Sequence, residues 1–141
     1  MPKRFTDTEI WKKQRWFKNL SPSNKLAFIY IKDMCNHAGI WKIDCSDLLE
    51  DTGLSEFNLT NFINAVNLDF DGISGAKINR ERIVIVQKTY LLITGFMQFQ
   101  YEKGDKTIPI NNITKSALNI LKHKKILDEG LSKGWVTLSQ G

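Results

Sequence analysis

Residues 11–55 read WKKQRWFKNLSPSNKLAFIYIKDMCNHAGIWKIDCSDLLEDTGLS, and this stretch decides the predicted fold. Its pattern predicts three short helices, with one strand between the second and the third. Asp7, just upstream, is a suitable N-cap for the first helix, whose apolar residues are Ile10, Trp11, Trp16, Phe17 and Leu20. Ser21 and Pro22 then predict the start of the second helix, with serine as the N-cap and proline at the first helical position.

The second helix is predicted to be central and mostly buried, because apolar residues cover most of its surface. These are Leu26, Phe28, Ile29, Tyr30, Ile31, Met34 and Cys35, and the polar strip is limited to Lys25, Lys32, Asp33 and Asn36. Gly39 ends the helix, and Ile40–Ile43 alternates as a short strand. Asp44 or Ser46 is then expected to cap a third helix, which stops at Gly53.

A fourth helix is predicted after the turn Thr52-Gly53-Leu54-Ser55, whose length is typical of a helix-turn-helix connection. Ser55 is expected to cap it, and its apolar residues recur at helical spacing: Leu59, Phe62, Ile63 and Val66. This is the candidate recognition helix, and its outward residues are Asn58, Thr60, Asn61 and Asn64. Asparagine can pair bidentately with adenine, which is worth roughly 1–3 kcal/mol of discrimination. A solvated polar face is the alternative interpretation.

The order of these elements predicts a winged helix-turn-helix domain, mainly α with a small β-sheet (α+β), followed by an additional C-terminal helix. The wing is expected from two β-rich runs, residues 76–79 and 82–86, joined near Arg80. Ile40–Ile43 should pair with the hairpin that includes Ile83–Val86, and Tyr90–Ile93 adds another strand. The aromatic stretch 96–101 is interpreted as core packing. One core is expected to hold Trp16, Phe17, Phe28, Tyr30, Leu49, Phe62 and Ile63.

Several short motifs also resemble a known family. They are Trp11 with WFKNLSP at 16–22, Lys25-Leu26, CNHAGI at 35–40 and TGLS at 52–55. Together they resemble the N-terminal domain of phage replisome organisers and related DnaD-type replication initiation proteins. FMQFQY at 96–101 and KSAL at 115–118 resemble segments that follow the winged helix in such proteins. The resemblance implies a DNA-binding role in replication initiation rather than catalysis.

The charge pattern raises a question about that role. Between Lys42 and Lys77 there is no lysine or arginine, whereas the same stretch contains Asp44, Asp47, Glu50, Asp51, Glu56, Asp69 and Asp71. DNA affinity depends largely on basic groups that neutralise phosphates. The helix-turn-helix is therefore either held on DNA by its basic surroundings or directed at a protein partner.

Basic residues form three clusters in the sequence, on a chain of formal net charge +5. The first is Lys3, Arg4, Lys12, Lys13, Arg15 and Lys18, the second is Lys77, Arg80, Arg82 and Lys88, and the third is Lys115, Lys122, His123, Lys124 and Lys125. One cluster alone is typical of a solvated face, but three favour an anionic partner, for which we expect double-stranded DNA. The expected phosphate contacts are Lys12, Lys13, Arg15, Lys77 and Lys88, with Arg80 and Arg82 at a hairpin tip.

The predicted domain organisation is a winged helix-turn-helix over residues 1–101, followed by a polar linker, a helix over about residues 114–127, and a tail. Gly130, Gly134 and Gly141 interrupt the last stretch, so Trp135–Leu138 is at best a short strand or a docked tail. We interpret the chain as the first domain of a longer protein, in which a C-terminal part would contact replication proteins.

No catalytic, metal or cofactor motif occurs in the sequence: there is no phosphate-binding Gly-rich loop, no Gly-x-Ser-x-Gly and no His-Glu-x-x-His. Cys35 and Cys45 have no CxxC partner and are interpreted as reduced thiols. No apolar run reaches the roughly 18 residues that span a membrane, and no signal segment follows the charged N-terminus. We therefore expect a cytoplasmic non-enzyme without cofactor or metal; the oligomeric state is left open.

Two hypotheses follow. The first is a DNA-binding domain of a phage or prophage replication protein, with a transcriptional regulator as a variant in the same class. The second is a winged-helix protein–protein module that uses its acidic helix-turn-helix as the contact surface. A continuous positive surface would favour DNA binding, whereas scattered charges would favour protein binding.

Overall fold

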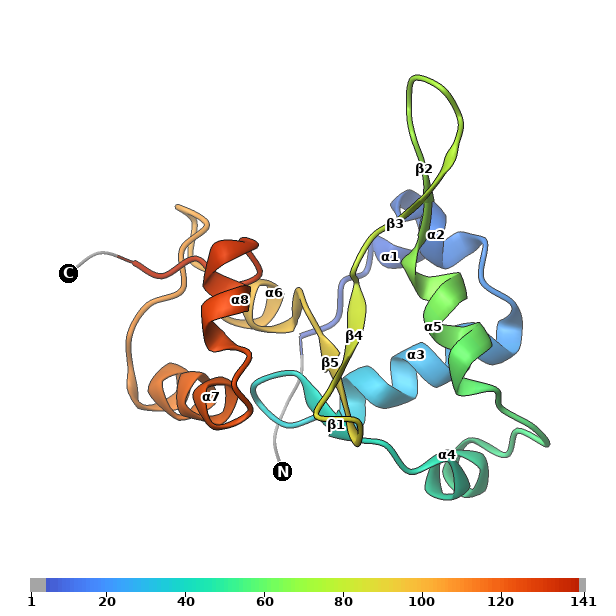
Figure 1. Ribbon diagram of the computed structural model, residues 1–141, viewed down its shortest axis with the longest axis horizontal. Coiled ribbons are helices and arrows are strands. Elements are labelled where there is room, and N and C mark those ends of the chain that lie inside the picture. Colours follow the sequence, from blue (N-terminus) through green and yellow to red (C-terminus); the bar gives the residue numbers. More distant parts are fainter. Residues whose placement is uncertain (1–4, 140–141) are drawn as a thin grey trace. The chain divides into compact units, whose positions relative to one another are not determined.

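The computed structural model describes residues 5–139. Within that range the chain is a small α+β fold of eight helices and five strands (Figure 1). In chain order the elements are α1 (Ile10–Lys13), α2 (Arg15–Lys18), α3 (Pro22–Met34), β1 (Ile40–Lys42), α4 (Cys45–Thr52), α5 (Leu59–Asn67), β2 (Leu68–Phe70), β3 (Lys77–Asn79), β4 (Ile83–Val86), β5 (Tyr90–Ile93), α6 (Phe96–Tyr101), α7 (Asn112–His123) and α8 (Leu127–Ser132).

The chain divides into two compact units, each built from two stretches of sequence. Unit 1 comprises Met1–Asp33 and Ile43–Ile83, and unit 2 comprises Met34–Lys42 and Val84–Gly141. Residues of the predicted N-terminal domain, 1–101, therefore contribute to both units. The predicted C-terminal segment, 102–141, lies wholly in unit 2.

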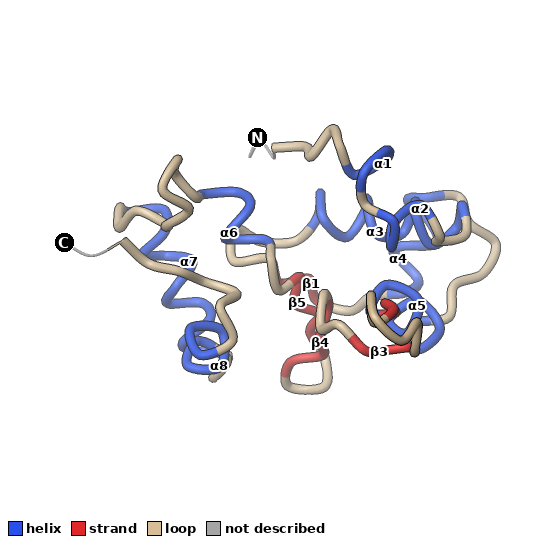
Figure 2. The backbone as a smooth tube through the Cα atoms, turned by 90° about the horizontal axis from the view of Figure 1, so that it is seen from above, coloured by secondary structure: helices blue, strands red, loops and turns tan. Residues whose placement is uncertain are grey.

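Unit 2 is organised around a small antiparallel sheet with strand order β1-β5-β4 (Figure 2). Ile40 pairs with Leu92 and Lys42 with Tyr90, so β1 lies along the second strand of the β4–β5 hairpin. The predicted pairing of residues 40–43 with the hairpin that includes residues 83–86 is thus confirmed. The buried core of unit 2 consists of Ala38, Ile40, Val86, Leu92, Met97, Ile108, Ala117, Leu121 and Val136.

The C-terminal helix predicted over about residues 114–127 is α7, which ends at His123, and a further helix, α8, follows it. An Asn111 capping box starts α7, and α7 ends at His123 because Lys125 adopts a left-handed backbone with φ of 60°. The backbone N–H groups of Lys125 and Ile126 then donate to the carbonyl oxygens of Lys122 and Leu121, which closes the helix with a Schellman motif. Farther on, Leu138 forms an isolated parallel bridge with Ile108, which is the docked tail that the sequence suggested.

Unit 1 is held together by edge-to-face aromatic contacts. The ring of Phe17 lies 5.0 Å from Trp11, 5.7 Å from Trp16 and 6.1 Å from Phe28, centroid to centroid. Each such pair stabilises the fold by roughly 0.5–1.5 kcal/mol beyond the contribution of the apolar area it buries. Of the seven residues predicted for this core, Phe17, Phe28 and Phe62 are buried, whereas Trp16, Tyr30, Leu49 and Ile63 are half-buried.

Two predictions about the N-terminal helices are wrong. The first helix is broken at Gln14, whose extended backbone (ψ of 97°) separates α1 from α2, so four helical segments precede α5 instead of three. The buried stripe of α3 is also narrower than predicted. Leu26 and Met34 are 42% and 56% exposed, while Lys32, which was assigned to the polar strip, is 8% exposed.

The two strands that were predicted to pair with each other as the wing do not pair. Residues 77–79 form β3, which pairs with β2 in a separate two-stranded sheet, with Asp69 opposite Ile78. Residues 83–86 form β4, which pairs with β5. The first hairpin projects from the end of α5 (Figure 1), and Ile73 at its tip is 98% exposed. None of the helices within residues 5–139 is long and apolar enough to cross a membrane.

Candidate nucleic-acid interface

Helix α5 presents the polar face that the sequence predicts. Asn58, Thr60, Asn61 and Asn64 are exposed, and Phe62 on the opposite side is buried. Asn58, however, is the N-cap of the helix: its Oδ1 accepts a hydrogen bond from the backbone N–H of Asn61 at 2.9 Å. The outward side chains without a capping role are therefore Thr60, Asn61 and Asn64.

The connection between α4 and α5 is longer than predicted and spans residues 53–58. Gly53 ends α4 in a left-handed conformation with φ of 78°, as expected, but Ser55 does not start the next helix. Phe57 instead packs on Phe62, with ring centroids 5.3 Å apart. These two residues flank the Asn58 cap as a hydrophobic staple, which is the sequence signal that identifies the helix start.

Asn67, at the end of α5, is a residue whose role the sequence did not reveal. It is buried, and its Nδ2 donates to the carbonyl oxygen of Ile83 at 2.9 Å. Its Oδ1 accepts from the backbone N–H groups of Arg82 and Ile83, both at 3.0 Å. One side chain therefore ties the end of α5 to the start of β4.

Arg82 is a structural residue of unit 1. Its Nη2 donates to Asp69 Oδ2 at 2.8 Å, and its Nη1 donates to the carbonyl oxygens of Val66 and Leu68 at 3.0 and 3.2 Å. The guanidinium carbon also lies 4.9 Å from the centroid of the Trp16 ring. The prediction that Arg82 stands at a hairpin tip is wrong, because its guanidinium binds Asp69 and the backbone at the end of α5 and only 22% of its side chain is exposed. Contact of Arg82 with DNA stays a prediction.

Arg80 follows the end of β3 and is likewise not at a hairpin tip. Its Nε lies 3.4 Å from Asp69 Oδ2, although 63% of its side chain is exposed. The pKa of Asp69 is held below its ordinary value by the backbone N–H of Phe70 and by the two arginines. Arg80 and Arg82 therefore share one carboxylate, which offsets part of the positive charge predicted here.

The N-terminal basic residues do come together. Lys12, Lys13, Arg15 and Lys18 surround one hollow over α1 and α2, and Lys13 forms an ion pair with Glu9 at 2.9 Å. Arg15 also lines a neighbouring hollow to which Ala65 of α5 and Leu68 of β2 contribute. The basic end of α2 thus flanks the C-terminal half of α5. Lys3 and Arg4 lie outside the described residues.

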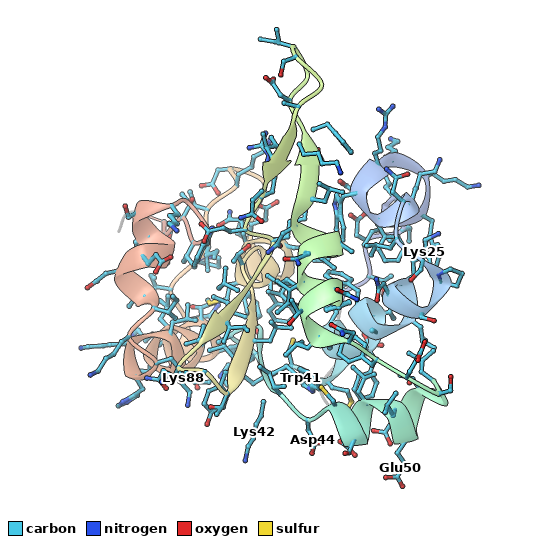
Figure 3. The ribbon with its side chains drawn as sticks, turned by 45° about the vertical axis from the view of Figure 1, so that its right-hand side comes forward. Lys25, Trp41, Lys42, Asp44, Glu50 and Lys88 are labelled. Atoms are coloured by element: carbon cyan, nitrogen blue, oxygen red, sulfur yellow. The ribbon has the colours of Figure 1, made fainter. Side chains whose placement is uncertain are left out.

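The second predicted cluster, in contrast, is divided. Lys77 is exposed on β3 and belongs to unit 1, as do Arg80 and Arg82. Lys88 belongs to unit 2, where it occupies the turn between β4 and β5 (Figure 3). The four residues therefore do not form one basic wing.

Four of the seven acidic residues between Lys42 and Lys77 lie in α4 or cap it. Asp44 caps α4, because its Oδ1 accepts a hydrogen bond of 3.0 Å from the backbone N–H of Asp47. The side chain of Glu50 points away from the helix (Figure 3). Asp51 accepts a hydrogen bond of 2.7 Å from the Tyr30 hydroxyl. Burial, and next the bond to Asp51, raise the pKa of Tyr30 above its ordinary value. Among residues 5–139, no group of three or more His, Cys, Asp or Glu side chains is placed to hold a metal ion.

Comparison with known proteins gives no relative: no family model, no curated protein and no solved structure matches this chain.

Proposed function

We propose that this protein is a DNA-binding module of the winged helix-turn-helix type, of the kind found in phage replisome organisers. The observation that carries the proposal is the sheet order β1-β5-β4 combined with the chain order α3-β1-α4-α5-β4-β5. In winged helix-turn-helix domains, the strand after the first helix joins a hairpin that follows the recognition helix. The β2–β3 hairpin is then an insertion between the recognition helix and the sheet.

Helix α5 would read bases through Thr60, Asn61 and Asn64. Short polar side chains on one exposed helix face suit the major groove, where amide groups can pair with adenine. Since α5 lacks basic residues, its neighbours must supply phosphate contacts. Lys12, Lys13, Arg15 and Lys18 on α1 and α2 support this role, because Arg15 lines a hollow beside α5.

The test is a binding titration of the intact chain with duplex DNA at about 50 mM and 200 mM salt, after selection of preferred sites from a random pool. We expect affinity to fall steeply between the two salt concentrations, by roughly 10³ or more if six phosphates are contacted. The Asn61→Ala/Asn64→Ala variant should lose about 1–3 kcal/mol of sequence discrimination per lost pair. Asn119→Ala, at an exposed position of α7, is the matched control.

A protein–protein module is the second candidate, and the surface of unit 1 favours it. Leu68, Phe70 and Ile73 of the β2–β3 hairpin are 37%, 45% and 98% exposed. Exposed apolar groups of this kind are typical of interaction surfaces. If the intact chain binds no DNA at low salt, the DNA-binding proposal is wrong and this second candidate takes its place.

A further inference from the structure

Unit 2 carries the net positive charge of the chain. The residues assigned to unit 1 include eleven basic and eleven acidic residues, so that unit is formally neutral. The residues assigned to unit 2 include nine lysines and four acidic residues. The formal net charge of +5 therefore resides in unit 2, whereas the predicted recognition helix belongs to unit 1.

Three of these lysines meet at one end of the sheet. Lys42 ends β1 and lies directly opposite Tyr90 of β5, so the two side chains share a face of the sheet. The ammonium group of Lys124, at the end of α7, sits 3.7 Å from the centroid of the Tyr90 ring. Lys88 lies in the β4–β5 turn that leads into Tyr90, and Figure 3 shows Lys42 and Lys88 at the same end of the sheet.

Lys122 and Lys125 extend this group along the end of α7, where they line a hollow with Leu127 and Asp128. We call Lys42, Lys88, Lys122, Lys124 and Lys125 the lysine surface. Within residues 5–139 none of them forms an ion pair, whereas Lys13, Arg80, Arg82 and Lys133 each do. Ammonium groups with no carboxylate within ion-pair distance remain able to bind an external anion.

Two members of the lysine surface occupy backbone positions that disfavour lysine. Lys88 has φ of 65°, next to Gln87 with φ of 51°, in a hairpin turn where Asn-Gly is the usual choice. Lys125 has φ of 60° at the position after a helix where glycine is usual. A left-handed conformation is unfavourable for a residue with a β-carbon, so glycine should be tolerated at both positions.

We propose that the lysine surface binds the phosphodiester backbone of DNA. The inference rests on the proposed function and adds that much of the electrostatic affinity comes from unit 2, through the turn of the β4–β5 hairpin and the end of α7. Each lysine would contact one phosphate as a point charge, without reading bases. Single-stranded and duplex DNA share this chemistry, so both serve as probes.

The strained positions allow a test in which charge is removed without loss of stability. Replacing Lys88 and Lys125 with glycine removes two charges and also relieves both left-handed conformations, so the melting temperature should stay the same or rise. Lys106→Gly is the matched control, because Lys106 also has a positive φ, of 63°. Lys106 belongs to the loop between α6 and α7. Figure 1 shows this loop away from the β4–β5 turn.

The measurement is anisotropy of a fluorescent random-sequence 30-mer, duplex or single-stranded, over a salt series of roughly 50 to 200 mM. The Lys88→Gly/Lys125→Gly variant should bind duplex roughly 10-fold or more weakly at the lowest salt, with a salt slope smaller by about 2. For the single strand the slope should fall by about 1.4, because fewer counterions are released per contact. Lys106→Gly should bind like the unaltered chain.

The outcomes separate the two proposals. If the intact chain binds neither probe at low salt, the proposed function fails, and this inference fails with it. If it binds but the double variant keeps its affinity and slope, or changes no more than Lys106→Gly, only the lysine surface is overturned. Weaker binding with a maintained melting temperature supports the lysine surface, because unfolding cannot explain it.

Discussion

At the scale of single residues, Asn67 shows how one buried amide can set the path of the chain. Its side chain makes three hydrogen bonds to the backbone of Arg82 and Ile83. These two residues follow the β2–β3 hairpin in the sequence, whereas Asn67 directly precedes it. Because these backbone groups are shielded from water, they need that partner. The amide of Asn67 therefore holds the start of β4 at the end of α5, independently of the conformation of the β2–β3 hairpin.

We expect Asn67→Leu to destabilise the chain by at least roughly 2 kcal/mol, since it keeps the side-chain volume but leaves buried backbone groups unpaired. Urea unfolding followed by circular dichroism measures the effect. Asn64→Leu, on the exposed side of the same helix, should change the free energy of unfolding by less than about 0.5 kcal/mol. Equal effects of the two variants would contradict the role assigned to Asn67.

Asp69 gives a prediction for the dependence of stability on pH. Its pKa in the folded chain is below the ordinary value of 3.8, through the Phe70 N–H and the contacts with Arg82 and Arg80. A carboxyl of this kind stabilises the fold above its unfolded pKa, and the contribution disappears as pH falls through the folded pKa. Asp69→Asn should therefore lower the melting temperature near pH 6, and the difference from the unaltered chain should shrink as the pH is lowered below 3.8. A difference independent of pH would contradict this.

The same residues show why the site was only partly predictable. The exposed face of α5 follows from helical spacing, and the structure confirms it at Asn58, Thr60, Asn61 and Asn64. The sequence does not distinguish a paired arginine from an unpaired one, because Arg82 and Asp69 are 13 residues apart and meet only through the hairpin. Capping by Asn58, in contrast, was readable from the apolar residues that flank it.

At the scale of elements, the sequence predicted the bounds of α4 but missed the starts of α5 and α7, which Asn58 and Asn111 cap. Asp44 and Gly53 bound α4 as expected, and β1 pairs with the hairpin assigned to it. Strand β2 was missed because it follows α5 with no breaker between Asn67 and Leu68. Without β2, residues 77–79 had no candidate partner except residues 83–86, so these two runs were predicted to form one hairpin.

Phe62 tests the assignment of the helix face of α5. Its side chain is fully buried, and it packs against Phe57 in the segment before the helix. Phe62→Ala should cost roughly 3–5 kcal/mol, which would unfold a domain of ordinary stability at modest temperature. Ile73→Ala, at the exposed hairpin tip, is the matched apolar control and should be nearly neutral. Thermal unfolding of both variants gives the comparison, and a near-neutral Phe62→Ala would mean that the face is misassigned.

At the scale of the whole molecule, the surplus positive charge is confined to one of the two units, which the composition of the whole chain does not reveal. A formal net charge of +5 looks modest for 141 residues. Once the chain is divided between its compact units, one is neutral and the other carries all of the surplus. The sequence did identify the lysines of the last cluster, but it could not show that Lys42 lies opposite Tyr90, whose ring Lys124 contacts, because that pairing depends on strand register.

This separation predicts different responses of the two units to salt. Like charges repel, so unit 2 should gain stability as the Debye length shortens from about 30 Å at 10 mM to about 8 Å at 150 mM. Unit 1 has balanced charges and ion pairs such as Arg82–Asp69, so its stability should stay the same or decrease. Hydrogen exchange distinguishes them within one sample: protection of the Leu91 and Leu92 amides in β5 should rise with salt, while that of Val66 in α5 should not. A parallel change at all three amides would show that the surplus charge does not act on unit 2 separately.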